Sequence, residues 1–211
     1  MTTNRYPLIA REGWWALAFV AVLATLVMNY IGFISSLPFW ILGGLLLFVF
    51  RDPPRSIPPN PLAVVSPVDG EVVSIEETHD PYLDRQAVLI SIQMNPYGVF
   101  STRSPVEGKM LEPPHNGQFH QHDSNGKAPH GVWLQTDEED DLVMVVNRGP
   151  FHNAPKCYAD FGERVGQGQR CGFIHFGSRV DIYLPPNSRI EVGQQDRVKG
   201  GTDVIASLVH K

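Results

Sequence analysis

A glycine-serine pair, Gly177-Ser178, interrupts the apolar stretch CGFIHFGSRVDIYLP that runs from Cys171 to Pro185. A serine hydroxyl can attack the carbonyl of its own preceding peptide bond, and a glycine there leaves that carbonyl sterically open. If a base takes the hydroxyl proton and donors stabilise the oxyanion, the amide becomes an ester. β-Elimination then cuts the chain and leaves dehydroalanine, which hydrolyses to a pyruvoyl group. The pair is therefore a candidate site of self-cleavage.

Histidines elsewhere in the chain are candidate bases for this reaction. His175 lies three residues before Ser178. Residues 175 and 178 of one strand point to opposite faces, so His175 reaches the serine only if the glycine breaks the alternation. His120 and His122, in FHQHD, could approach from a loop or bind a metal. A zinc site needs further ligands that the sequence does not indicate, so a polar loop is favoured over a metallopeptidase and no metal is predicted.

The N-terminal part of the chain is typical of a membrane hairpin. No charged residue occurs from Gly13 to Phe50, and one spanning helix needs about 20 apolar residues. We expect helices near 13–32 and 37–50, separated by a turn within MNYIGFISSLP. A pair of buried helices in a soluble protein is the alternative, but such helices rarely lack a polar face.

Basic residues predict how this hairpin is oriented. They flank it on both sides, and the turn has none. The positive-inside rule then places both ends in the cytoplasm, so we expect a cell-membrane protein with its remaining domain on the cytoplasmic side. The flanking basic residues are Arg5, Arg11, Arg51 and Arg55, and Trp14, Trp15 and Trp40 are suited to the headgroup region.

The rest of the chain predicts a mainly β fold. A proline-rich connector over 51–61 excludes helix and central strand there. From residue 62 to 211, short apolar runs rich in Val, Ile and Phe alternate with turn signals. We therefore expect a compact β-sandwich or barrel-like domain with lipoyl-like hairpins, preceded by the α-helical membrane hairpin over 1–50. The formal net charge of -5 gives no basic footprint for nucleic acid.

An internal repetition accompanies these turns. SPVDGEV (Ser66 to Val72) resembles SPVEGKM (Ser104 to Met110), and FGERVGQGQRCGFI (Phe161 to Ile174) has the glycine pattern of lipoyl-like hairpins. Each motif indicates a turn before it indicates any function, because proline and glycine are common turn residues. The two cysteines, Cys157 and Cys171, match no metal or redox spacing and read as reduced thiols.

Four dispersed motifs together resemble one family. They are REGWWALAF before the hairpin, FRDPPRSIP after it, SPVDG at Ser66 to Gly70, and FGSRVDIYLP. In this order they resemble the short, membrane-associated type of phosphatidylserine decarboxylase. The resemblance covers the chain from about Arg11 to about Pro186 and is weak between about Pro113 and Lys156.

The resemblance implies a proenzyme that cuts itself between Gly177 and Ser178. Ser178 would become the pyruvoyl, the only cofactor, at the start of a small chain of residues 178–211, paired as a heterodimer with a large chain of residues 1–177. The pyruvoyl ketone would form a Schiff base with the serine amine of the phospholipid, accept electrons as CO₂ leaves, and so yield phosphatidylethanolamine. Asp69 of SPVDG matches the acid that orients a histidine for self-cleavage in this family.

The sequence departs from the family at that histidine. The matching position is Phe100, in NPYGVFSTRSPVEG, and phenylalanine cannot accept a proton. The middle segment also lacks the Asn-Glu-Arg stretch and the paired arginines expected of the family. Two alternatives follow: a non-catalytic membrane-bound relative that binds lipid or partners, and a pyruvoyl enzyme that decarboxylates another amine substrate.

Overall fold

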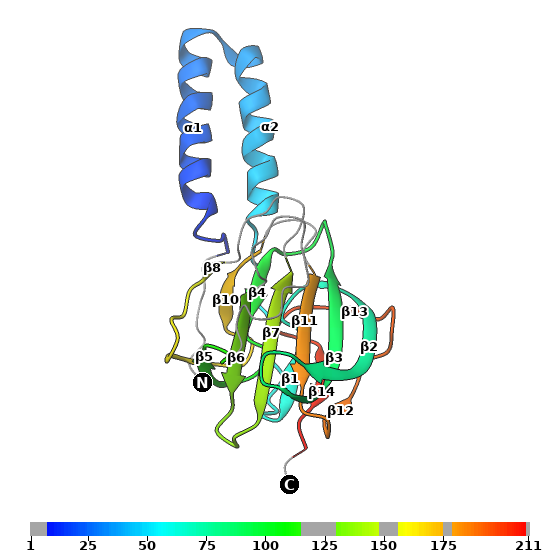
Figure 1. Ribbon diagram of the computed structural model, residues 1–211. Coiled ribbons are helices and arrows are strands. Elements are labelled where there is room, and N and C mark those ends of the chain that lie inside the picture. The colour runs from blue at the N-terminus through cyan, green and yellow to red at the C-terminus, as the bar shows by residue number, and fades with distance from the viewer. Residues whose placement is uncertain (1–7, 115–129, 148–155, 175–178, 210–211) are drawn as a thin grey trace. The chain divides into compact units, whose positions relative to one another are not determined.

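The computed structural model of the protein describes residues 8–114, 130–147, 156–174 and 179–209. The chain separates into two compact units, Met1–Pro54 and Arg55–Lys211. The first unit contains the helices α1 and α2, and the second contains the strands β1 to β14 (Figure 1). The sequence prediction of a mainly β protein with two N-terminal helices is confirmed.

The helical unit is an antiparallel hairpin. Helix α1 spans Gly13–Tyr30 and α2 spans Phe33–Val49. Gly32 makes the turn with φ of 124°, a backbone conformation open to glycine and strained for other residues. The expected start of the second helix at residue 37 is therefore wrong: Ser36 donates a hydrogen bond of 2.7 Å to the oxygen of Phe33, and α2 continues through Pro38.

The hairpin closes at its base and is apolar on its surface. The nitrogen of Ala10 donates to the oxygen of Phe50 at 2.8 Å, and that of Asp52 donates to the oxygen of Leu8 at 2.7 Å. Large apolar side chains, among them Trp15 and Ile34, stay exposed along both helices. By length and composition Gly13–Tyr30 can cross a membrane, and Phe33–Val49 is a shorter apolar helix.

The second unit is built from antiparallel strands, and its described residues contain no helix. Alternating apolar residues and glycine or proline turns account for this preference. The strands are β1 (Ala63–Val65), β2 (Gly70–Asp80), β3 (Arg85–Met94), β4 (Ser101–Arg103), β5 (Gly108–Leu111), β6 (His130–Gln135), β7 (Asp141–Asn147), β8 (Lys156–Cys157), β9 (Arg164–Val165), β10 (Arg170–Phe173), β11 (Arg179–Leu184), β12 (Arg189–Ile190), β13 (Arg197–Val198) and β14 (Val204–Ser207).

These strands form three sheets. The largest has the order β13-β2-β3-β11-β7-β6-β5-β9, and two three-stranded sheets have the orders β1-β14-β12 and β4-β10-β8. Strand β11 is central in the large sheet, whereas β10, which precedes it in sequence, belongs to a small one (Figure 1). The apolar stretch around Gly177-Ser178 is therefore two strands of different sheets, with the glycine-serine pair between them.

The core lies on one face of the large sheet, and a smaller apolar cluster covers part of the other. Ile90, Ile92 and Ile182 are fully buried on the core side. On the opposite side Tyr82 packs on Val143 and Val145. Strand β7 is thus buried on both faces, which explains why its sequence, DLVMVVN, is a continuous apolar run instead of an alternation.

The predicted repetition corresponds to two matching turn-and-strand units. Ser66 Oγ donates to the oxygen of Val68 at 2.7 Å, and Ser104 Oγ donates to the oxygen of Val106 at the same distance. Each unit then begins a strand at a glycine, Gly70 in β2 and Gly108 in β5.

The strands that pair with β2 and β5, which are β13 and β9, also correspond to each other. Gly70 pairs with Val198 of β13, and Gly108 pairs with Val165 of β9. The oxygen of Ser66 accepts from Gly201, and the oxygen of Ser104 accepts from Gly168. Because these contacts match one for one, the two halves of the unit share one local architecture.

Candidate active site

The described residues on either side of the predicted cleavage segment, Ile174 and Arg179, are each bonded to other parts of the chain. Residues 175–178, with His175, Gly177 and Ser178, lie outside the described residues. On the near side, the nitrogen of Ile174 donates to the oxygen of Phe100 at 2.7 Å. On the far side, Arg179 begins β11 and pairs with Gln93 of β3 and Asn147 of β7. The loop bearing Phe100 and the ends of β3 and β7 therefore contact the two residues that flank the segment.

Asp69 lies in the turn that precedes β2 and connects separate parts of the chain. Its Oδ1 accepts from the nitrogen of Gly200 at 2.8 Å, and its Oδ2 accepts from Arg55 Nη2 at 2.7 Å. Oδ2 also lies 3.4 Å from the nitrogen of Val99, at the limit of a hydrogen bond. Its main-chain oxygen accepts from Asn95 at 3.0 Å. The carboxylate thus bonds to other segments, and not merely within its own turn.

Asp69 is packed directly against the loop that leads to Phe100. A Cβ placed on Gly98 would lie 3.1 Å from Cβ of Asp69, so a larger residue at 98 would crowd the acid. Since Phe100 in turn accepts from Ile174, the structure connects Asp69, the Phe100 loop and the start of the cleavage segment.

Phe100 is a core residue. Its side chain is 2% exposed, and its ring lies 6.2 Å from that of Phe173 at an interplanar angle of 54°. This tilted geometry is typical of packed aromatic pairs. The position at which the sequence resemblance leads us to expect a histidine is therefore occupied by an apolar side chain buried against β10.

A buried carboxylate follows the cleavage segment on β11. Asp181 is 5% exposed. Its Oδ1 accepts from Ser91 Oγ at 2.6 Å, and its Oδ2 accepts from Arg179 Nη2 at 3.0 Å and from the side-chain amide of Asn147. Arg179 and Asp181 are two residues apart on one strand, so their side chains share a face. Ser91 and Asn147 come from neighbouring strands, and no local motif marks them.

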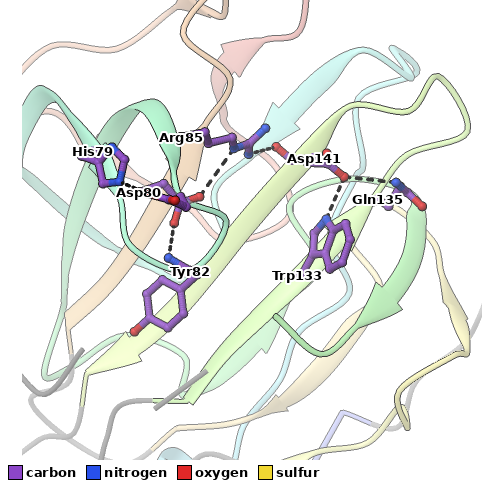
Figure 2. Close-up of polar contacts among 8 residues, drawn as sticks. His79, Asp80, Tyr82, Arg85, Trp133, Gln135 and Asp141 are labelled. Atoms are coloured by element: carbon purple, nitrogen blue, oxygen red, sulfur yellow. Dashed lines mark hydrogen bonds and ion pairs between the residues drawn. The ribbon is translucent and has the colours of Figure 1, made fainter. Parts of the chain in front are cut away.

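A second polar cluster lies near the β2–β3 turn (Figure 2). Figure 2 shows Arg85 between the carboxylate of Asp80 and the main-chain oxygen of Asp141. Trp133 Nε1 donates to Asp141 Oδ1 at 2.7 Å, and the nitrogen of Tyr82 donates to Asp80 Oδ1 at 2.8 Å. Sequence reasoning missed this cluster, which joins β2, β3, β6 and β7.

Burial changes the acidity of several groups around these clusters. It raises the pKa of Asp80 above its usual value, despite the opposing effects of Tyr82 and Arg85. Burial and then the charges of Asp181 and Asp80 raise the pKa of Tyr183 to about 12. The pKa of Tyr82 is raised by burial first and then by Tyr183 and the two acids. Both phenols therefore stay protonated at neutral pH.

The described residues contain no group of three side chains arranged to hold a metal ion. His120 and His122, which motivate the metal alternative, lie outside the described residues. Cys171 is buried as a free thiol.

Comparison with known proteins shows which enzymes this chain resembles in sequence. Residues 42–206 match the family model described as phosphatidylserine decarboxylase. The phosphatidylserine decarboxylase proenzyme of Nitrosomonas eutropha is 40% identical over 215 residues, which cover 99% of this chain and 100% of that protein. The proenzyme of the same name from Aromatoleum aromaticum is 40% identical and covers 98% of this chain and 99% of its own.

Among solved structures, the IIA glucose permease from Mycoplasma capricolum aligns with a TM-score of 0.44 and 17% identity. The alignment covers 69% of this chain and 94% of that chain.

Proposed function

This chain belongs to the phosphatidylserine decarboxylase family, and we propose that it converts phosphatidylserine to phosphatidylethanolamine with a pyruvoyl group made from Ser178. The family is one of proenzymes, so the active form follows a cut in the chain. A pyruvoyl group at this position supplies the electron-accepting carbonyl that loss of CO₂ from a bound amino acid requires. No external cofactor enters the reaction.

The proposed self-cleavage consumes no reactant other than water. Ser178 Oγ bonds to the carbonyl carbon of Gly177 as the peptide C–N bond breaks, which gives an ester and a free amine on residue 178. Loss of the Cα proton of residue 178 then breaks its Cβ–Oγ bond, and Gly177 leaves as a carboxylate. Water replaces the nitrogen of residue 178, which departs as ammonia.

The fold supports a cut at this position because each side of the bond is anchored separately. Residue 174 bonds to Phe100, and residue 179 begins a strand between β3 and β7. After the cut, residues 178–211 retain β11, which pairs with β3 and β7, β13, which pairs with β2, and β14, which pairs with β1. We therefore propose that the large and small chains stay together as a heterodimer.

Within this scheme Asp69 is the orienting acid and His175 the candidate base. Asp69 provides a fixed carboxylate beside the Phe100 loop, whose main chain contacts Ile174 directly before His175. Phe100 itself cannot take the proton of Ser178. His175 is therefore the proposed acceptor, because it is the titratable residue closest in sequence before the bond.

The apolar N-terminal hairpin supports association with a membrane, where the lipid substrate resides. The membrane helix Gly13–Tyr30 carries no charge. We propose that both ends of the hairpin face the cytoplasm, following the basic residues that flank it. The unit Arg55–Lys211, which we call the catalytic unit, would then also be cytoplasmic.

Mass measurement tests the proposal. Intact mass spectrometry of the purified wild type should find chains of residues 1–177 and 178–211, the second with a pyruvoyl terminus, and Ser178→Ala should stay whole. Purified enzyme in detergent should release CO₂ from phosphatidylserine, and Ser178→Ala should not. A wild-type chain that remains in one piece would contradict the proposal.

The buried Phe100 favours a second candidate, a non-catalytic relative that binds lipid or partners. In that case the wild type stays whole, and Phe100→His restores the cut. A third candidate, decarboxylation of another amine substrate, follows from the altered middle segment of the sequence. Assay of the cut enzyme with phosphatidylserine, serine and other amino acids distinguishes this candidate from the first.

A further inference from the structure

Arg55 forms an ion pair with Asp69, the acid that we propose takes part in self-cleavage at Gly177-Ser178 (the processing site). The residue belongs to the proline-rich connector over 51–61, which the sequence suggests is a spacer. Its Nη2 lies 2.7 Å from Oδ2 of Asp69, and the two side chains are only 13% and 17% exposed. A pair this sheltered from water is screened less by salt than a surface pair. Arg55 therefore has a specific partner within the catalytic unit.

Among the described residues, the other donors to the Asp69 side chain are backbone amides. Gly200 and Val99 supply N–H groups at 2.8 and 3.4 Å, whereas Arg55 supplies the full positive charge. Backbone amides hold a position, but a guanidinium also compensates the charge of a poorly hydrated carboxylate. Arg55 thus has an electrostatic function here that neither amide can replace.

We propose that Arg55 is a positioning residue for self-cleavage: it holds the carboxylate of Asp69 against the Phe100 loop and so makes the cut depend on a docked connector. The proposal rests on the proposed function of Ser178. The same arginine that suggests membrane orientation in the sequence is bound inside the catalytic unit. Completion of the processing site therefore requires the segment that immediately follows the membrane hairpin.

The internal repeat provides a comparison. Glu107 occupies in SPVEG the position that Asp69 occupies in SPVDG, and it is exposed. Both acids precede the glycine that starts a strand, Gly70 or Gly108. The turn therefore forms with its acid exposed to solvent, so the enclosure of Asp69 by Arg55 is not a requirement of the turn itself.

The experiment measures the rate of chain splitting in the full-length protein. Wild type, Arg55→Gln, Arg55→Lys, Asp69→Asn and the double variant Arg55→Gln/Asp69→Asn are synthesised in the presence of lipid vesicles and sampled on denaturing gels. Arg164→Gln is the matched control, because Arg164 pairs with Asp137 at 2.5 Å in an exposed ion pair. Melting temperatures of the purified, uncut Ser178→Ala forms are recorded for each background.

We expect Arg55→Gln to slow splitting by about tenfold or more, and Arg55→Lys to remain within about threefold of wild type, because lysine keeps the charge. The double variant should split no more slowly than Asp69→Asn alone, since both changes break one interaction. Arg164→Gln should split at the wild-type rate.

Different outcomes separate the two proposals. Wild-type splitting with an equally fast Arg55→Gln overturns the role of Arg55 and leaves the proposed function intact. Equal slowing by glutamine and lysine, with equal losses of melting temperature, also overturns the role and assigns Arg55 to stability alone. A wild type that never splits removes both proposals.

Discussion

The oxygen of Phe100 accepts a hydrogen bond of 2.7 Å from the nitrogen of Ile174. Ile174 lies four residues before Ser178, whose preceding peptide bond we propose is cut. The contact involves main-chain atoms only. In the matching half of the repeat, the oxygen of Leu62 accepts from the nitrogen of Leu208 at 2.8 Å. Residue 100 therefore performs a structural task that is independent of its side chain, and this explains how a phenylalanine can stand there without loss of the local fold.

Substitution of Phe100 by leucine should therefore separate stability from cleavage. Leucine keeps the main-chain bond to Ile174 but loses the ring contact with Phe173, so the free energy of unfolding should fall by about 1–2 kcal/mol. Splitting should continue at the wild-type rate. Denaturant titration of the uncut Ser178→Ala background and a gel time course check the two effects. Loss of splitting in a protein of unchanged stability would show instead that the ring takes part.

The glycines that begin β2 and β5 provide a paired prediction. A Cβ on Gly70 would lie 2.3 Å from the oxygen of Gln93, and one on Gly108 would lie 2.3 Å from the oxygen of Gln135. Alanine at either position must displace a strand, which should lower the free energy of unfolding by about 1–3 kcal/mol. Because Gly70 follows Asp69 directly, only Gly70→Ala should also slow splitting. Equal rates in both variants would mean that Asp69 tolerates movement of its turn.

Loss of the buried Asp181 carboxylate should destabilise the fold far more than loss of its exposed partner Arg179. Asp181→Asn places an amide donor toward that of Asn147 and ends the ion pair with Arg179, so unfolding should become easier by about 2–4 kcal/mol. Arg179→Gln is the matched control: its side chain is 49% exposed, so the loss should stay below about 1 kcal/mol. Denaturant midpoints of uncut protein measure both. Similar losses in the two variants would contradict the importance of burial.

Asp80 should make the protein less stable as pH rises. Its side chain is fully buried, and burial raises its pKa above the usual value of 3.8. The folded protein then keeps a proton that the unfolded chain releases, so the free energy of unfolding falls with increasing pH from about 3.8 upward until the folded group has ionised. Asp80→Asn should reduce this fall.

The check is a series of denaturant titrations from acid to neutral pH in the uncut background. Asp137→Asn, at an exposed carboxylate, should leave the pH dependence close to that of wild type. If Asp80→Asn and wild type lose the same stability over the whole range, the burial of a charged Asp80 is compensated by Arg85 and the prediction fails.

Local patterns were sufficient to predict the elements but not how the elements combine. Uncharged residues from 13 to 50 predict two helices, yet Ser36 and Pro38 suggest a turn that Gly32 alone makes. A glycine with positive φ breaks a helix outright, whereas a serine can bond back to its own helix and remain within it.

The site shows the same limit. Asp69 is identified from its motif, but its partner Gly200 lies 131 residues further along the chain. Ser91 lies 90 residues before the Asp181 that it binds. Periodicity reports which face of a strand a residue occupies, but the identity of the neighbouring strand depends on the whole fold. Such contacts cannot be predicted from the residues of either segment alone.

The cut that we propose would separate β10 and β11, which belong to different sheets, and would change how the protein refolds. Before the cut, folding is a rearrangement within one polymer, independent of how dilute the protein is. Afterwards, complete unfolding releases two polymers, and recovery requires them to meet, so reassembly becomes a second-order process that weakens with dilution. Under the proposed cleavage, folding must therefore be complete before Ser178 reacts, and the cut enzyme would persist because it unfolds slowly, not because it refolds readily.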